Sequence, residues 1–221
     1  DGLGVNYQNG ESVYVGLNHL YEEITWFYPK SGSSYVDRCV TYNYQDQTWT
    51  TGSLARTTWA DANLYDVPYA TEFDPTGLPT FPTIQGVTNI NGSFKYYAHE
   101  VGVDQVDSAG AKTAIPAFIQ SGDFDLGIEG DGQIFMSMRR FVPDFKVLTG
   151  DAQVTINLRD YPSTAAASSP LGPFTINSST DKVDTRARSR FASLKIANTS
   201  TEQSWRYGTF RADVQPDGMR G

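Results

Sequence analysis

Turn-forming residues interrupt this sequence so often that long helices are excluded from most of it. Clusters of Gly, Pro, Asn and Asp recur about every ten residues, and the segments between them show little helical periodicity. Short segments bounded by turn clusters are typical of strands. Aromatic residues make up 13% and charged residues only 19% of the chain, and ring side chains favour half-buried pleated surfaces. The sequence therefore predicts an all-β protein.

The N-terminal part contains segments that are typical of propeller blades. Residues 22–29 read as a strand that Pro29 ends, and residues 37–52 read as a hairpin with its turn at 45–47. A strand, a polar turn and a returning strand with a Trp are usual at the outer edge of a β-propeller blade. At roughly 40 to 50 residues per blade, residues 1–130 would hold about three blades. Because about three blades cannot close a circle, we expect further blades in a longer polypeptide.

A proline-rich stretch separates these segments from another strand. Prolines 75, 79 and 82 lead us to predict a loop, not a central strand, over residues 68–84. Residues 92–102 then read as a strand with Phe94, Tyr96 and Ala98 on one side.

The alternation of apolar and polar residues becomes cleaner after residue 130. Val154, Ile156 and Leu158 share one face of the segment 151–162, as in an antiparallel sheet with one wet face. Residues 163–173 read as a loop of small residues. We therefore expect partial propeller blades over residues 1–130 and an antiparallel β-sheet or sandwich platform over residues 131–221, which ends in a basic strand and tail.

In the segment 174–198, the apolar residues move from odd-numbered to even-numbered positions along its length. Val183, Ala187 and Phe191 would share one face, whereas Leu194 and Ile196 would lie on the other. A β-bulge between Arg190 and Leu194 would restore the register, and we predict one there.

The net charge of −8 is unevenly distributed along the chain. Residues 181–221 carry eight basic and five acidic side chains, so the other 180 residues carry −11. An acidic body with a basic end favours self-association or docking on an acidic partner, and it argues against a dedicated nucleic-acid binder. The candidate contact residues between subunits or with a partner are Arg186, Arg188, Arg190, Arg206, Arg211 and Arg220.

Three of these arginines would form a row. In a strand, Arg186, Arg188 and Arg190 project from one face with a repeat of roughly 6.5 to 7 Å. Guanidinium groups suit carboxylates on a neighbouring subunit, which is the reading that we favour. A solvated strand face and direct contact with DNA are the alternatives.

Acidic and histidine side chains offer candidates for catalysis or metal binding. Asp123, Asp125, Glu129 and Asp131 could hold a metal or form an acid/base pair, but their spacing does not fit a calcium loop, and we interpret them as turn-capping acids. His99 and Glu100 could form an acid/base couple, and His19 stands alone; structural hydrogen bonds are the commoner role for such residues. We therefore expect no catalytic residue, no metal and no cofactor.

Four tryptophans and one cysteine complete the candidates. Trp26, Trp49, Trp59 and Trp205 would form a sugar-binding platform if they clustered at the surface, although such residues are more often core. Cys39 has no partner for an internal disulfide or a cysteine-based zinc site. No apolar run approaches the roughly 18 residues of a membrane-spanning helix, so we expect no membrane span.

Seven blocks, taken in order over residues 20–221, resemble one known family. They are WFYP, DRCVTYNYQDQTWTTGSLARTTW, YYAHEVGVD, MRRFVPDF, VTINLRDYP, KVDTRARSRFASLKI and WRYGTFRADVQPDGMRG. The family is that of the tail nozzle, packaged-DNA stabilisation or tail hub proteins of short-tailed bacteriophages and related prophages. Family members are longer, and their N-terminal portion has no counterpart in this sequence.

The resemblance implies a structural virion protein without enzymatic activity. Such proteins combine a complete or incomplete β-propeller with a β-sheet platform and form rings of about six subunits. The ring lies below the portal and adaptor proteins, adjoins tail fibre or needle proteins, retains the packaged genome and lets DNA pass without binding it specifically. The implied location is the virion tail, and the host cytoplasm during assembly.

Two other classes of function stay open. A carbohydrate-binding or glycoside-processing propeller would bring the acids of residues 123–131 together with exposed Trp or Tyr in a pocket. A monomeric ligand-binding domain would pair the arginine row within its own chain.

Overall fold

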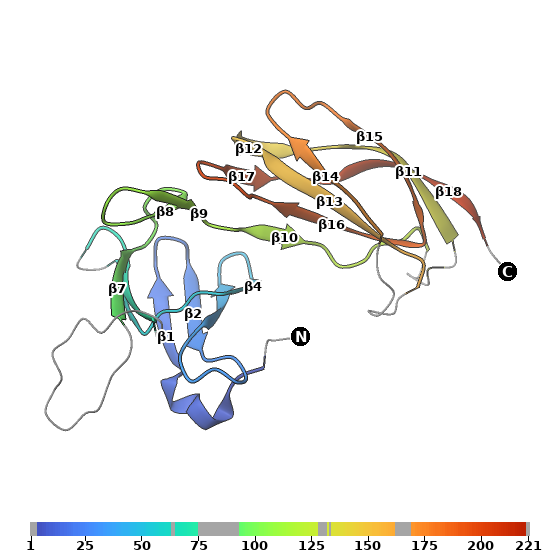
Figure 1. Cartoon of the computed structure of the whole chain (residues 1–221). Helices are drawn as coiled ribbons and strands as arrows, with labels where there is room; N and C mark the ends of the chain where they lie inside the picture. The colour runs from blue at the N-terminus through green and yellow to red at the C-terminus, as the bar shows by residue number, and fades with distance from the viewer. Residues whose placement is uncertain are drawn as a thin grey trace, which may run out of the picture. The chain divides into compact units, whose positions relative to one another are not determined.

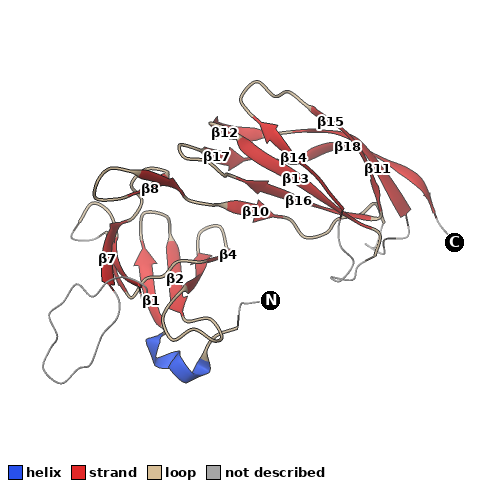
Figure 2. Cartoon of the chain, in the orientation of Figure 1, coloured by secondary structure: helices blue, strands red, loops and turns tan. Residues whose placement is uncertain are grey.

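The computed structural model describes residues 4–62, 65–74, 93–127, 132, 134–161 and 169–219 of the 221-residue chain. Within these ranges the chain forms strands and one short 3-10 helix, η1 (Tyr7–Ser12), so the predicted all-β fold is confirmed (Figure 2). No helix in the described ranges is long and apolar enough to cross a membrane. Contacts divide the chain into two compact units, which we call unit 1 (residues 1–101) and unit 2 (residues 102–221).

Unit 1 begins with a four-stranded antiparallel sheet whose strands pair in chain order (Figure 1). Its strands are β1 (Tyr14–Asn18), β2 (Glu23–Tyr28), β3 (Arg38–Asn43) and β4 (Thr48–Gly52). The predicted strand before Pro29 and the hairpin over residues 37–52 are both confirmed. Pro29 follows β2 directly, and it has no N–H group with which to extend the ladder.

A three-stranded antiparallel sheet forms the second layer of unit 1. Its strands are β5 (Thr58–Ala60), β6 (Tyr69–Asp74) and β7 (Ser93–Ala98), with β6 in the centre. The loop predicted over residues 68–84 is therefore wrong for residues 69–74. The three prolines that suggested it follow Asp74 and lie outside the described residues. The strand predicted within residues 92–102 is confirmed as β7.

The two sheets of unit 1 enclose a small core. Its buried hydrophobic residues are Phe27, Val36 and Cys39, with Trp59 packed against them. A Cβ atom on Gly16 would lie 2.6 Å from the Trp59 ring, so β1 can approach β5 this closely only with glycine at position 16. The size of this core means that much of the aromatic surface of unit 1 faces outward.

Unit 2 is built mainly from two antiparallel sheets. One sheet runs in the order β10-β16-β13-β14 and the other in the order β15-β11-β18, and two further pairs are β12-β17 and β8-β9 (Figure 1). The strands are β8 (Asp104–Val106), β9 (Lys112–Ala114), β10 (Phe118–Gln120), β11 (Ile134–Val142), β12 (Phe145–Thr149), β13 (Ala152–Arg159), β14 (Ser169–Ile176), β15 (Val183–Ser189), β16 (Phe191–Ala197), β17 (Ser204–Tyr207) and β18 (Arg211–Met219).

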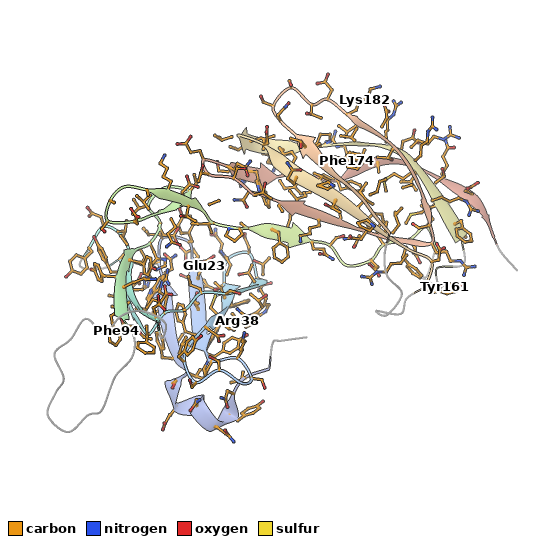
Figure 3. All side chains as sticks on the ribbon, in the orientation of Figure 1. Glu23, Arg38, Phe94, Tyr161, Phe174 and Lys182 are labelled. Atoms are coloured by element: carbon orange, nitrogen blue, oxygen red, sulfur yellow. The ribbon has the colours of Figure 1, made fainter. Side chains whose placement is uncertain are left out.

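The inner faces of the two main sheets form one continuous core. Met138 and Phe141 of β11 contribute from one sheet, and Val154 and Ile156 of β13 contribute from the other. Phe174 packs against this cluster, whereas Lys182 extends into solvent (Figure 3). The alternation read from residues 151–162 is therefore confirmed, and the platform is a sandwich with one shared core.

The described residues 102–127 associate with the sandwich of unit 2. β10 pairs with β16, Phe124 forms a bridge with Ala192, and the Asp104 carboxylate accepts a hydrogen bond from the Glu202 backbone N–H at 2.9 Å. The division between the two units therefore falls after residue 101, about thirty residues before the boundary that the sequence predicted.

Two local predictions in unit 2 are wrong. The loop predicted over residues 163–173 includes the first part of β14, which pairs with β13. The register of this pair shifts beside Gly172, whose φ is +105° and whose added Cβ would lie 2.9 Å from the Val154 carbonyl oxygen. Small residues therefore mark a bulged strand here, and not only a loop.

The bulge predicted between Arg190 and Leu194 is replaced by a change of sheet. β15 ends at Ser189 and pairs with β11, whereas β16 begins at Phe191 and pairs with β13. The apolar residues move to even-numbered positions because the chain passes from one sheet of the sandwich to the opposite sheet at Arg190.

Candidate functional site

The arginine row predicted from the sequence is only partly formed. Arg186 and Arg188 are exposed on β15, while Ala187 and Ser189 point into the core. Arg190 lies beyond the end of the strand and is half-buried, with its guanidinium carbon 4.9 Å from the centroid of the Phe135 ring. The row therefore has two members on the strand and one at the corner where the chain changes sheet.

Two of the candidate arginines are paired within the chain. The Arg188 Nε donates a hydrogen bond to the Asp217 carboxylate at 2.5 Å, and its Nη2 donates to the Asp217 carbonyl oxygen at 3.2 Å. Arg211 forms an ion pair with Asp144 at 3.3 Å. Residues 211–219 form the paired strand β18, so most of the predicted basic tail belongs to the sheet.

The other candidate arginines differ from this pair. The side chains of Arg186 and Arg206 are exposed and form no ion pair or hydrogen bond with any residue in the described ranges. Arg220 lies outside the described residues. The arginines are thus neither all paired within the chain, as a monomeric domain would have them, nor all available to a partner.

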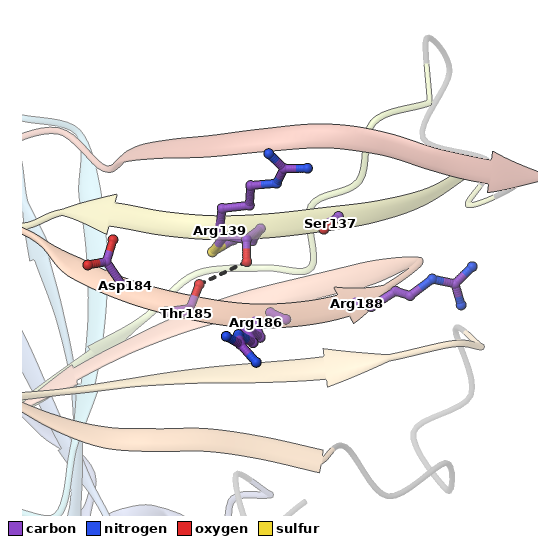
Figure 4. A pocket seen from close by; sticks show the side chains of 8 residues that line it. Ser137, Arg139, Asp184, Thr185, Arg186 and Arg188 are labelled. Carbon is purple, nitrogen blue, oxygen red and sulfur yellow. Dashed lines mark hydrogen bonds between the residues drawn. The ribbon is translucent and has the colours of Figure 1, made fainter.

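A groove of about 410 Å³ lies between β11 and β15 on the outer face of their sheet (Figure 4). The Thr185 hydroxyl donates a hydrogen bond to the Met138 carbonyl oxygen at 2.9 Å across its floor. The groove is lined by Ser137, Met138, Arg139, Asp184, Thr185, Arg186, Ala187 and Arg188.

Arg139 is the groove arginine that the sequence analysis missed. The ladders on both sides of β11 shift register between Met138 and Arg140, so Arg139 and Arg140 are both exposed between buried Met138 and buried Phe141. Strict alternation would have buried one of them. Two successive arginines between large apolar residues were the available signal for a β-bulge.

The acidic segment after β10 serves local structure. Asp123 forms an ion pair with Arg159 at 3.1 Å, and Asp125 accepts hydrogen bonds from the backbone N–H groups of Gly127 and Gly132 at 3.2 and 2.8 Å. Asp125 therefore caps a turn, as the sequence interpretation expected. Glu129 and Asp131 lie outside the described residues. Within the described ranges, no group of three or more His, Cys, Asp and Glu side chains is arranged to hold a metal ion.

The two histidines have separate structural partners. His19 Nδ1 pairs with the Asp61 carboxylate. His99 Nε2 accepts a hydrogen bond from Arg56 Nε at 2.9 Å, whereas Glu100 accepts one from the Asn18 amide at 3.0 Å. Burial, assisted by the Arg56 charge, lowers the pKa of His99 to about 4. His99 and Glu100 therefore do not hydrogen-bond to one another as an acid/base couple.

The aromatic residues of unit 1 gather on both of its outer faces. On the outer face of the four-stranded sheet, the Trp49 ring lies 5.8 Å from Trp26 and 4.6 Å from Tyr42, and Trp49 is 62% exposed. On the outer face of the three-stranded sheet, Tyr96 stacks on Tyr69 at 5.2 Å and is 66% exposed. Each sheet thus has a second apolar face on which at least one large aromatic side chain stays more than half exposed.

The two remaining tryptophans occupy interior positions. Trp59 packs against Phe27 in the small core of unit 1, and its indole N–H donates to the Leu17 carbonyl oxygen. Trp205 packs against the large core of unit 2. Only Trp26 and Trp49 therefore meet the expectation of tryptophans that cluster at the surface.

The chain matches no protein-family model, and no curated protein shows significant similarity to it.

Proposed function

We propose that this chain is part of a ring-shaped nozzle in the tail of a short-tailed bacteriophage. Unit 1 would contribute blades to a β-propeller, and unit 2 would form the platform. About six subunits would surround a channel below the portal and adaptor, retain the packaged genome and let it leave during ejection. The proposed role is structural and assigns no catalytic residue.

The observation that carries the proposal is the pair of exposed apolar faces on unit 1. A four-stranded antiparallel meander is the arrangement of a propeller blade, and blades stack around a central axis. The sheets β1-β4 and β5-β7 contact one another through Phe27 and Trp59, as two neighbouring blades would. Their outer faces carry Trp49 and Tyr96, which favours two blades within a larger circle over a finished two-layer domain.

The distribution of charge is consistent with a DNA conduit. Unit 1 has eleven acidic and four basic side chains, a net charge of −7, whereas unit 2 has fourteen acidic and thirteen basic side chains, a net charge of −1. A negative wall repels phosphates, and it therefore lets DNA move without a tightly bound state.

The native mass of the full-length product tests this proposal. Mass photometry would be run on the protein alone and with a purified portal-adaptor complex. A ring of about six subunits, formed alone or only on that complex, is the expected result. A protein that stays monomeric and does not bind the portal-adaptor complex at any concentration would contradict the nozzle proposal.

A second candidate function is carbohydrate binding by the aromatic face of β2, β3 and β4. The cluster of Trp26, Tyr42 and Trp49 favours it, because sugars stack on exposed rings. However, neighbouring rings in this cluster lie against one another, and this leaves less free ring face for a sugar. Fluorescence titration with a panel of oligosaccharides tests for carbohydrate binding, and Trp49→Ala is the control. Saturable quenching that Trp49→Ala abolishes would favour this candidate.

A further inference from the structure

We propose that the groove between β11 and β15 binds acidic side chains of a second copy of this chain. This inference rests on the proposed ring, and it identifies the groove as one side of the contact between neighbouring subunits. The central residues are Arg139 and Arg186, one from each strand.

These two arginines carry charge that the described part of the chain does not neutralise. The guanidinium groups of Arg139 and Arg186 are exposed and have no ion pair or hydrogen bond with any residue in the described ranges. Asp184 also lines the groove, but its carboxylate pairs with Arg140 at 3.2 Å and with Lys182 at 3.8 Å. Arg188 is held by Asp217. The unpaired positive charge is therefore centred on Arg139 and Arg186.

The separation of these side chains indicates an extended partner. The guanidinium groups of Arg139, Arg186 and Arg188 lie apart from one another around the groove (Figure 4). A small anion on the groove floor could not receive hydrogen bonds from all of them. Carboxylates spaced along a protein surface can pair with each guanidinium separately, and the planar fork of arginine favours such pairs.

The charges around the groove favour carboxylates on a protein over the phosphates of a nucleic acid. Asp184 lies in the groove and Asp217 lies beside Arg188. These acids interrupt the positive surface, and together with the net charge of −8 they would repel a continuous row of phosphates. A protein surface of mixed charge, with acids in excess, can match this pattern.

Unit 1 of the same chain supplies exposed carboxylates. Its net charge of −7 contrasts with −1 on unit 2. Glu11, Asp46 and Asp66 are exposed there and form no ion pair with any described residue. A contact from unit 2 of one subunit to unit 1 of the next is head-to-tail, and a contact of this kind closes rings when its rotation allows.

The test compares self-association of the full chain with that of two charge-reversal variants. The groove variant carries Arg139→Glu and Arg186→Glu. The control carries Lys146→Glu and Lys112→Glu, which makes the same change in net charge at two exposed lysines that neither line the groove nor pair with a groove residue. Sedimentation velocity would follow a concentration series at about 50 and about 300 mM NaCl, because salt screens exposed charges. Circular dichroism would verify that both variants are folded.

We expect the groove variant to associate at least about tenfold more weakly than the wild type, and the control to stay within about threefold of it. The wild-type association should also weaken at the higher salt concentration. A wild-type ring that the groove variant leaves intact would overturn the groove assignment alone, while the nozzle proposal would stand. A wild-type chain that stays monomeric, alone and with the portal-adaptor complex, would overturn both.

A second experiment, with DNA, distinguishes a groove that binds carboxylates from one that binds phosphates. Binding of a duplex of about 30 base pairs would be measured by fluorescence anisotropy at both salt concentrations. Negligible binding at about 300 mM NaCl supports the assignment. Tight binding that Arg139→Glu with Arg186→Glu abolishes, without a change in self-association, would overturn it in favour of a phosphate-binding face.

Discussion

The two units of this protein bury their hydrophobic residues to very different extents. In the described residues, the core cluster of unit 2 contains eleven buried hydrophobic side chains, whereas that of unit 1 contains three. Unit 2 closes its core between two sheets and keeps mainly polar residues on the outer face of β15. Unit 1 instead exposes aromatic residues on both outer faces. The difference indicates that the sandwich supplies its own stability, while unit 1 is suited to further contacts.

Unit 1 also contains a polar network around one nearly buried charged side chain, Arg56. The Arg56 guanidinium is nearly buried; its Nη1 donates to the Glu72 carboxylate at 3.0 Å and to the Ala55 carbonyl oxygen at 2.8 Å. Its guanidinium carbon lies 4.1 Å from the Tyr97 ring centroid, and its Nε donates to His99. Such a network is sensitive to the loss of one member, because the remaining polar groups are left unpaired.

The largest expected effect is the loss of a ring from the core of unit 2. Phe141→Ala removes a side chain that is 1% exposed and packs between the sheets. We expect about 3 to 5 kcal/mol of lost stability from the cavity and the lost burial. Denaturant unfolding measures it, with Val142→Ala, at the adjacent exposed position, as control. A loss below about 1 kcal/mol would mean that the sandwich core is less tightly packed than we describe.

Removal of the buried guanidinium should have the largest effect in unit 1. Arg56→Met leaves the Glu72 carboxylate and His99 without their donor, and we expect a loss of about 2 to 3 kcal/mol after allowing for the partial exposure of Glu72. Adding Glu72→Gln should recover part of the loss. Hydrogen exchange of peptides from residues 1–101 reports the effect. Equal losses in Arg56→Met and in Lys95→Met, which breaks the exposed pair with Asp74, would contradict a special role for the buried network.

The close approach of β1 and β5 predicts a smaller effect. Gly16→Ala places a methyl group 2.6 Å from the Trp59 ring, and overpacking should cost about 1 to 3 kcal/mol. Gly10→Ala is the matched control, because no atom outside its neighbours lies within 4 Å of the added Cβ. Thermal unfolding followed by tryptophan fluorescence compares the two variants. Indistinguishable melting temperatures would show that the two sheets of unit 1 can move apart slightly without a loss of stability.

The stability of unit 1 should also depend on pH. The pKa of His99 is lowered from 6.5 to about 4, so the folded state favours the neutral imidazole. Its contribution to stability is complete above pH 6.5 and declines as the pH falls from 6.5 to about 4, because the unfolded chain takes up the proton first. His99→Gln keeps an acceptor for Arg56 and should flatten the stability profile in this window. The same slope in wild type and variant would exclude His99 as its source.

Local pattern predicted the strands better than it predicted their partners. The alternation of Val154 and Ile156 was correct because one face of β13 is buried. Asp125 was interpreted correctly as a turn-capping acid because its partners lie within seven residues. By contrast, Arg188 pairs with Asp217, twenty-nine residues away, and no local pattern reveals that contact. Arg139 escaped notice because a bulge suspends the alternation that sequence reading assumes.

The sequence by itself determined that this protein is all-β, since frequent turn residues and a period of two leave short strands as the only regular structure for most of the chain. In strands without a bulge, it also determined which side chains share a face. Only the tertiary structure decided which sheet each strand joins, where the chain passes between sheets at Arg190, and which arginines are left unpaired. The physical reason is that alternation follows from the local backbone, whereas strand pairing and charge pairing depend on chain segments far apart in the sequence.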